Sequence, residues 1–250
     1  MEIKTIGCHP ANFRSGRGGL RPKAIVIHII VGSQQSADSW FNNPAAGVSA
    51  HFSVSKGGEV HQYVDTDDTA FHTGVVASPT WIGIEHRPDG SFLNPNLYTI
   101  GIEHEGMPED DWTDAMYDAS SRLVRMSADR YVIPLDSNHV IHHREIRATK
   151  TCPGFKVDVG RITAQARSLP PVDPGPTPST EVVTVVKANL RKGAPSTQAS
   201  VLMTIPAGTH VSVVGFVTNG EVVKGNPNWY EDRDGNFLWA GTTSQPNPTQ

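Results

Sequence analysis

The sequence predicts an α/β domain with a mixed central sheet flanked by helices, followed by a small all-β barrel. Between residues 23 and 168, short β-branched runs alternate with amphipathic segments, which is typical of a mixed sheet with helical cover. Five prolines then fall within residues 169–181. After them, short β-rich runs alternate with Gly and Pro turns, a pattern that favours a small barrel.

These changes in composition and pattern predict that the chain has four parts. The first domain spans residues 1–168 and the second spans residues 182–243. Residues 169–181 between them have no apolar pattern to bury, so we expect a stiff, extended linker. Residues 244–250 form a short tail.

Several runs in the first domain predict strands. Residues 23–31 read K-A-I-V-I-H-I-I-V, a continuous apolar run typical of a strand covered on both faces. Residues 49–54 and 59–64 alternate in period two around Ser-Lys-Gly-Gly, which predicts a hairpin. Residues 98–103 are the next apolar strand, and a short strand is expected at 138–141.

The clearest helix is expected over residues 112–131, with Asp111 or Thr113 as its cap and Pro134 as its end. A shorter helix is expected at residues 36–41. A final helix is indicated by apolar spacing at Ile162, Ala166 and Leu169, and residues 9–22 and 78–96 are expected to be an irregular lead-in and a surface loop.

Composition narrows the function. The net charge of −4 gives no reason to expect a nucleic-acid partner, for which a basic face is typical. No apolar run approaches the roughly 20 residues of a membrane span. The N-terminal residues lack a basic region followed by an apolar one, so we expect no signal peptide, synthesis in the cytoplasm and no membrane insertion. A monomer is expected.

Potential metal ligands gather in residues 140–155, V-I-H-H-R-E-I-R-A-T-K-T-C-P-G-F. A catalytic zinc takes three protein ligands, commonly imidazole or thiolate, and keeps an open position. The adjacent His142 and His143 with Cys152 can supply two of the three, and His28 in a predicted strand can supply the third. Lys150 would place a positive charge near an oxyanion as it develops.

Two structural alternatives remain open at this point. His28 on its own suits a hydrogen-bonded core histidine. Cys8 and Cys152 are the two cysteines of the chain, so a Cys8–Cys152 disulfide is the alternative to a metal role for Cys152.

The chain also resembles a known family, the zinc-dependent N-acetylmuramoyl-L-alanine amidases related to peptidoglycan recognition proteins and common among phage endolysins. The resemblance runs over residues 24–155. It rests on five motifs in the family's order: I-V-I-H, S-A-H-F-S-V followed by G-G-E-V-H-Q, A-F-H-T-G, T-I-G-I-E-H-E-G and H-R-E-I-R-A-T-K-T-C-P-G. The C-terminal part resembles a bacterial SH3-like domain, through A-N-L-R-K-G-A-P-S-T, P-A-G-T-H-V and N-W-Y.

The resemblance implies a Zn²⁺ site. By position, His28 matches the first ligand, Cys152 the last, and His143 the middle one, with His142 as the alternative. Glu103 matches the catalytic glutamate, which takes a proton from the attacking water, and Lys150 matches the lysine that polarises the scissile carbonyl.

Three further residues are placed by their motifs. Glu85 lies in W-I-G-I-E-H, a near copy of the motif around Glu103, but its closeness to A-F-H-T-G and the surrounding prolines favour Glu103. His51 and His72 match positions near the substrate groove, where a structural hydrogen bond is the alternative to substrate binding.

The resemblance implies a peptidoglycan hydrolase that cleaves the amide between N-acetylmuramic acid and L-alanine, an endolysin whose SH3-like domain holds it on the cell wall after release. One alternative is a non-catalytic peptidoglycan-binding protein of the same fold, which would lack a zinc ligand. Another is a cell-wall peptidase with Cys152 as nucleophile and His143 as base.

Overall fold

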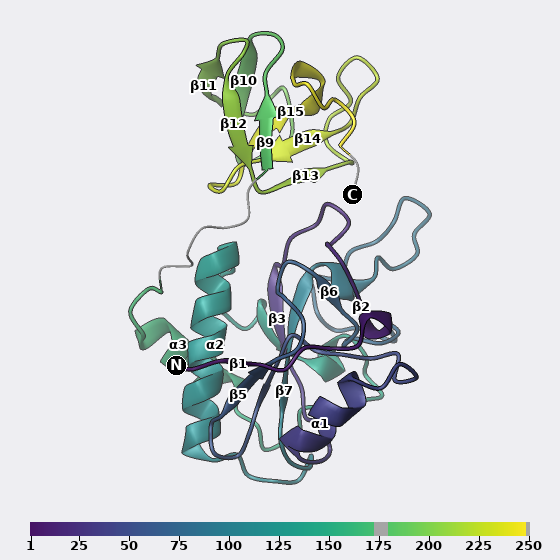
Figure 1. The fold of residues 1–250 in the computed structure, drawn as a ribbon, viewed down its shortest axis with the longest axis vertical. Helices are drawn as coiled ribbons and strands as arrows, with labels where there is room; N and C mark the ends of the chain where they lie inside the picture. The colour runs from purple at the N-terminus through teal and green to yellow at the C-terminus, as the bar shows by residue number, and fades with distance from the viewer. Residues whose placement is uncertain (173–179, 249–250) are drawn as a thin grey trace. The chain divides into compact units, whose positions relative to one another are not determined.

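The computed structural model describes residues 1–172 and 180–248, which form two compact units. Nearly all described residues before 173 belong to the first unit, and those after 179 belong to the second (Figure 1). Among the described residues, no helix is both long and apolar enough to cross a lipid bilayer.

The first unit contains a six-stranded mixed sheet in the order β1-β5-β4-β7-β3-β8, as the sequence predicts. Its strands are β1 (Lys4–Thr5), β3 (Ala24–Ile27), β4 (Phe52–Val54), β5 (Val60–Gln62), β7 (Thr99–His104) and β8 (Val140–His142). Strands β4, β7, β3 and β8 are mutually parallel, and the predicted hairpin joins β4 to an antiparallel β5. The carboxyl ends of four neighbouring strands therefore meet at one edge.

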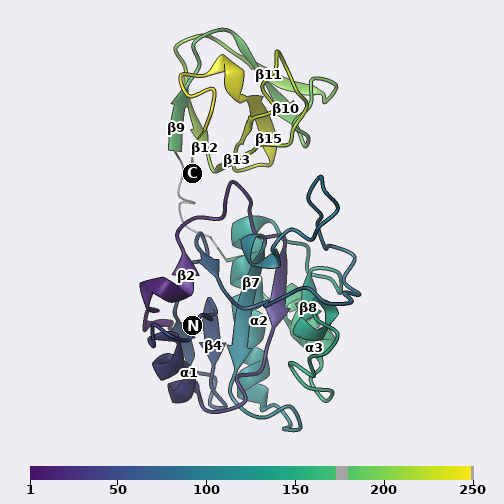
Figure 2. The ribbon, with the colours of Figure 1, turned by 90° about the vertical axis from the view of Figure 1, so that its right-hand side faces the viewer.

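Helices cover the sheet on both faces. Helices α2 (Asp114–Tyr131) and α3 (Val159–Ser168) lie on one side, and α1 (Gln34–Phe41) lies on the other (Figures 1 and 2). On the α1 side, Gln34 Nε2 donates to Ser53 Oγ at 3.0 Å, and Tyr63 Oη donates to Asp38 Oδ1 at 2.7 Å.

The two faces of the sheet differ in chemistry because side chains alternate along a strand. The α2 face is apolar. Its core joins Ile25, Ile27, Phe52, Ile100 and Ile102 of the strands to Met116, Leu123 and Ile162 of the helices. The residues between them, among them Ser53, Glu103 and His28, point to the other face, which becomes the polar one.

The helix ends follow local capping, with one difference from expectation. Thr113 caps α2, its hydroxyl accepting from the Met116 N–H at 3.1 Å. The helix ends at Tyr131, before Pro134, because Val132 adopts a left-handed conformation with φ of 57°. A valine is costly there, so its identity gave no sign of a helix end.

Short elements escaped the sequence analysis. The expected lead-in contains η1 (Pro10–Asn12) and β2 (Phe13–Arg14), which pairs with β6 (Thr69–Ala70). The expected surface loop ends in η2 (Pro95–Leu97), and η3 (His143–Glu145) follows β8. Elements of two or three residues carry no hydrophobic period to recognise.

The second unit is all-β, as predicted. An antiparallel sheet runs in the order β11-β10-β15-β14-β13, and β12 pairs with β9. The elements are β9 (Thr180–Val183), β10 (Ala188–Lys192), β11 (Val201–Ile205), β12 (His210–Val213), β13 (Gly215–Val217), β14 (Trp229–Glu231), β15 (Asn236–Trp239) and η4 (Ala240–Thr242). Of the predicted linker, residues 173–179 lie outside the described residues, and β9 begins within its last two positions.

Replacing Val132 with glycine should stabilise the first unit. Val132 is 72% exposed and holds φ of 57°, so the change removes left-handed strain of about 1–2 kcal/mol and adds about 0.5–1 kcal/mol of chain entropy. We expect the free energy of unfolding to rise by roughly 0.5–1 kcal/mol in urea titrations. Val75→Gly is the matched control, because Val75 is also 72% exposed and has no positive φ; it should destabilise. Equal losses in both variants would contradict this account.

Candidate active site

Strand register brings three of the predicted site residues level on the polar face. Ile27 of β3 pairs with Ile102 of β7 and with His142 of β8. The residues that follow these three in the chain are His28, just after β3, Glu103 within β7, and His143, the first residue of η3. The three come from segments far apart in the sequence and lie side by side at the carboxyl edge.

The loop after β8 adds Cys152 and separates the two adjacent histidines. Cys152 Sγ lies 3.8 Å from His28 Nδ1 and accepts from the Ile29 N–H at 3.2 Å. The ring of His143 faces His28, with 3.1 Å between their Nδ1 atoms. His142 turns away, and its Nδ1 lies 2.7 Å from Glu145 Oε1. The geometry thus brings His143, and not His142, into the cluster.

The chemistry and spacing of this cluster fit a zinc ion. The ligand atoms of His28, His143 and Cys152 all lie within 4.8 Å of one another, and all three residues are buried. A tetrahedral zinc with ordinary Zn–N and Zn–S bonds places its donor atoms about 3.3–3.6 Å apart. Burial lowers the pKa of both His28 and His143, which keeps the rings neutral, as metal ligands must be.

Glu103 lies beside the cluster with an unsatisfied carboxylate. Its Oε1 is 3.9 Å from His28 Nδ1, and its buried Oε2 has no hydrogen-bond partner among the described residues. Burial raises the pKa of Glu103 to about 8, against a smaller lowering by the charge of Lys150. A carboxyl group with a pKa near neutrality can both take up and release a proton.

A cavity of about 600 Å³ opens over these groups. His28, Glu103, His143, Lys150 and Cys152 all line it. Lys150 is exposed and supplies a cation at the mouth of the cavity. The predicted acid–base, cationic and metal-ligating residues therefore share one hollow.

The other two histidines predicted near the substrate groove lie deeper. His51 has no exposed surface; its Nδ1 accepts from the Gly101 N–H at 3.0 Å and its Nε2 lies 2.8 Å from Arg17 Nη2. His72 is 7% exposed and lines the cavity, with its Nδ1 3.0 Å from His28 Nε2. For both, these contacts favour the structural alternative over direct substrate binding.

Glu85 lies away from the cavity, on the loop that precedes β7. Its carboxylate pairs with the Lys23 ammonium, and it is absent from the residues that line the cavity. The geometry thus supports the choice of Glu103 between the two near-identical motifs.

The disulfide alternative is wrong, since both cysteines are free. Cys8 Sγ donates to the Phe41 carbonyl at 3.3 Å. Burial and the Glu103 charge raise the pKa of the Cys152 thiol, the reverse of what a nucleophilic cysteine needs.

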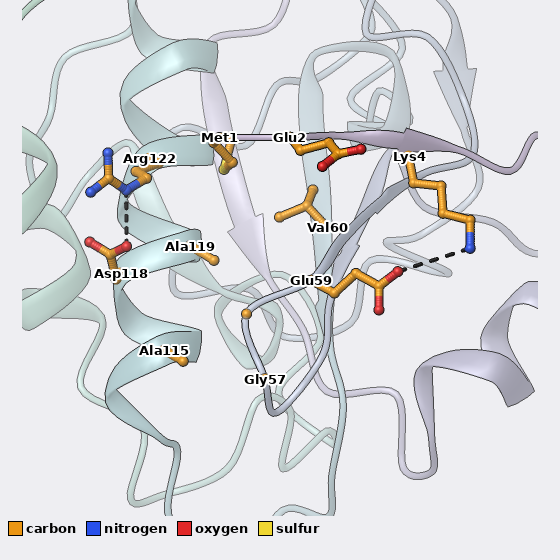
Figure 3. A pocket seen from close by; sticks show the side chains of 11 residues that line it. Met1, Glu2, Lys4, Gly57, Glu59, Val60, Ala115, Asp118, Ala119 and Arg122 are labelled. Carbon is orange, nitrogen blue, oxygen red and sulfur yellow. Dashed lines mark hydrogen bonds and ion pairs between the residues drawn. The ribbon is translucent and has the colours of Figure 1, made fainter.

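A second hollow of similar volume, about 600 Å³, lies between residues 57–60 and α2 (Figure 3). Four of its charged side chains form two pairs: Lys4 with Glu59 at 4.0 Å, and Arg122 with Asp118 at 2.9 Å. No histidine or cysteine lines it, so the chemistry gathers at the first cavity.

Sequence reasoning missed several polar residues that support the site. His104 is fully buried, and its Nδ1 donates to the His28 carbonyl at 2.9 Å. Asn96 and Thr99 both contact His72: Asn96 Oδ1 accepts from its backbone N–H, and Thr99 Oγ1 lies 3.2 Å from its Nε2. Only the period-two parity of β7 could have found His104, which it places on the face opposite Glu103.

Comparison with known families decides the relationship. The family model described as N-acetylmuramoyl-L-alanine amidase, Amidase_2, matches residues 18–155, more than half of the chain. The chain belongs to the Amidase_2 family. The matched range contains every residue of the cluster.

Among curated proteins, N-acetylmuramoyl-L-alanine amidase A of Achromobacter lyticus is 36% identical over 105 residues, covering 41% of this chain and 49% of that protein. The 1,6-anhydro-N-acetylmuramyl-L-alanine amidase AmpD of Citrobacter freundii is 34% identical over 118 residues, covering 47% and 56%. The chain thus spans about half the length of these relatives. A crystal structure of a Se-Met AmpD derivative superposes with a TM-score of 0.54 at 27% identity, covering 66% of this chain and 94% of that one.

Replacing Cys152 with serine should weaken zinc binding while Cys8→Ser leaves it unchanged. Of the two free thiols, only Cys152 lies in the cluster. We expect the wild type and Cys8→Ser to bind one zinc per chain, and the zinc Kd of Cys152→Ser to rise by more than about 100-fold, measured by competition with a chromophoric chelator. Equal affinity in all three proteins would rule out Cys152 as a ligand.

Glu103→Gln should stabilise the metal-free chain, and more so at high pH. Because the folded-state pKa of Glu103 is raised from 4.5 to about 8, wild-type stability is lost as the pH rises through that window. A glutamine amide at this position does not titrate. We expect the variant's advantage in free energy of unfolding to be on the order of 2–4 kcal/mol larger at pH 8 than at pH 5, by denaturant titration with chelator present. The same advantage at both pH values would refute a raised pKa at Glu103.

Proposed function

We propose that this protein is a zinc-dependent N-acetylmuramoyl-L-alanine amidase that hydrolyses the amide joining N-acetylmuramic acid to the L-alanine of the peptidoglycan stem. The observation that carries the proposal is the convergence of a buried His, His, Cys donor set and an unpaired, proton-binding Glu103 in one cavity. Family membership and the activities for which the relatives are named supply the substrate class.

His28, His143 and Cys152 would hold the metal. When bound, zinc supplies a Lewis acid that acidifies water and polarises a carbonyl. His28 follows β3 directly, His143 follows β8 directly, and Cys152 lies in the loop beyond η3. Cys152 would bind as the thiolate and give up its proton when the cation binds.

Glu103 performs the proton transfers. Its free Oε2 accepts a proton from the water that attacks the scissile carbonyl carbon. As the C–N bond breaks, the same carboxyl returns that proton to the departing L-alanine nitrogen, so protons balance over the cycle. Burial raises the pKa of Glu103 to about 8 in the metal-free chain, and a bound cation would lower that pKa and favour the carboxylate.

Lys150 acts on the carbonyl oxygen. Its exposed ammonium lines the cavity with Glu103, where it can donate to the oxygen as negative charge builds. The same positive charge lowers the pKa of Glu103 and favours the carboxylate that starts the reaction.

The competing functions fit the geometry less well. A thiol peptidase needs an activated thiolate, whereas burial raises the pKa of the Cys152 thiol. A non-catalytic binding protein of this fold would lack a ligand, whereas all three donors are present and converge.

The finer parts of the proposal concern the whole chain. We infer that the second unit is an SH3-like module that keeps the enzyme on its insoluble substrate, where tethering raises the local concentration of the catalytic unit. Its all-β architecture supports this. An endolysin acting on the cell wall would combine amide hydrolysis by the first unit with wall binding by the second.

Digestion of purified peptidoglycan tests the proposal. The wild type should release new L-alanine amino termini with intact glycan chains, read by mass analysis. Activity should vanish with a strong chelator and return with zinc, and Glu103→Gln should lose at least about 100-fold, the lower range for a general base.

New reducing ends or other peptide termini would sink the amidase assignment. Activity that survives chelation would sink the metal mechanism. Activity confined to small muropeptides would overturn a role on the intact wall.

A further inference from the structure

The outer nitrogens of both histidine ligands meet one two-residue segment, His72–Thr73. His28 Nε2 lies 3.0 Å from His72 Nδ1, and His143 Nε2 lies 2.9 Å from the Thr73 carbonyl oxygen. Both segment residues are buried. Strands β3 and β8 thus depend on a single neighbouring segment for the orientation of their ligands.

The direction of each hydrogen bond follows from groups that can act in only one way. The Thr73 carbonyl only accepts, so His143 Nε2 carries the proton and His143 Nδ1 has a free lone pair. Neutral imidazole has one donor and one acceptor, so this contact fixes the tautomer of His143.

The tautomer of His28 is fixed by a longer chain. The Thr99 hydroxyl donates to the Pro95 carbonyl at 2.7 Å, and its oxygen therefore accepts from His72 Nε2, 3.2 Å away. His72 Nδ1 is then the acceptor, and His28 Nε2 must donate to it. The free lone pair of His28 is left on Nδ1, facing His143 Nδ1.

The segment is itself held by one side chain. Asn96 Oδ1 accepts from the N–H groups of His72 and Thr73, at 3.0 and 2.9 Å, and from the Thr73 hydroxyl at 3.0 Å. Gly101 makes room for the ring, since a Cβ at this position would lie 2.5 Å from His72 Cγ. These contacts fix the backbone position of the segment and the place of the His72 ring beside β7.

We propose that the His72–Thr73 segment, held by Asn96 and backed by Thr99, is the positioning element of the zinc site, which locks both histidine ligands in the tautomer that binds metal through Nδ1. The proposal rests on the zinc site of the proposed function. His72 and Thr99 act through His28 and need no contact with substrate. Outer partners of this kind commonly govern metal affinity and ligand orientation.

Zinc affinity of the full chain tests the proposal without reference to activity. His72→Ala should raise the zinc Kd by about 10–100-fold. His72→Asn should recover most of that loss, because an amide oxygen can accept where Nδ1 did. Thr99→Val should raise the Kd, whereas Thr99→Ser, which keeps the hydroxyl, should not. His61→Ala is the matched control, a buried histidine whose ring contacts Asp38 and Glu59 outside the site.

Nitrogen-15 spectra of the zinc-loaded wild type give a second readout. Both ligand rings should show a protonated Nε2 and a metal-bound Nδ1. A protonated Nδ1 in either ring, or unchanged zinc Kd in both His72→Ala and Thr99→Val, would overturn the proposal. If His72→Ala fails to fold, the near-isosteric Thr99 pair decides. A wild type that binds no zinc would instead remove the proposed function itself.

Discussion

The register between parallel strands is the constraint on which the site depends. Ile27 pairs with Ile102 on one side and with His142 on the other, and the period-two alternation then aims His28, Glu103 and His143 at the same space. A slip of one residue in either pairing would turn a candidate ligand or the carboxylate to the opposite face of the sheet. The apolar face under α2 and α3 resists such a slip because it buries the alternate side chains completely. The same strand register is thus required both for packing of the core and for the geometry of the candidate site.

Much of this could be predicted from the sequence. The apolar runs predicted the strands, and the alternation of side chains within them predicted which residues share a face of the sheet. The candidate ligand set followed from residue chemistry and motif order, since imidazole and thiolate are ligands that zinc prefers. The choice between His142 and His143 could not be settled, because it depends on how the chain turns after β8. There the Glu145 carboxylate contacts the His142 ring, and the hydrophobic periodicity of the sequence does not predict such a contact.

The supporting groups were out of reach for a different reason. His51 and His72 were placed near the substrate because sequence position alone cannot distinguish a ring at the surface from one beneath it. Asn96 and Thr99 looked like ordinary loop and strand residues, yet each satisfies a polar group of the buried segment. Such roles depend on partners more than 20 positions away, and an isolated sequence does not display those pairings.

Gly101 illustrates how two distant motifs become inseparable. A glycine normally weakens a strand interior, but here its missing side chain is the space that the His72 imidazole occupies. The A-F-H-T-G and T-I-G-I-E segments therefore pack against each other, and the ring of the first fits only where the second has a glycine. A chimera that takes one segment from a protein with a bulkier strand residue would have to expel the ring. For recombination among proteins of this family, the unit of exchange is this pair and not either motif alone.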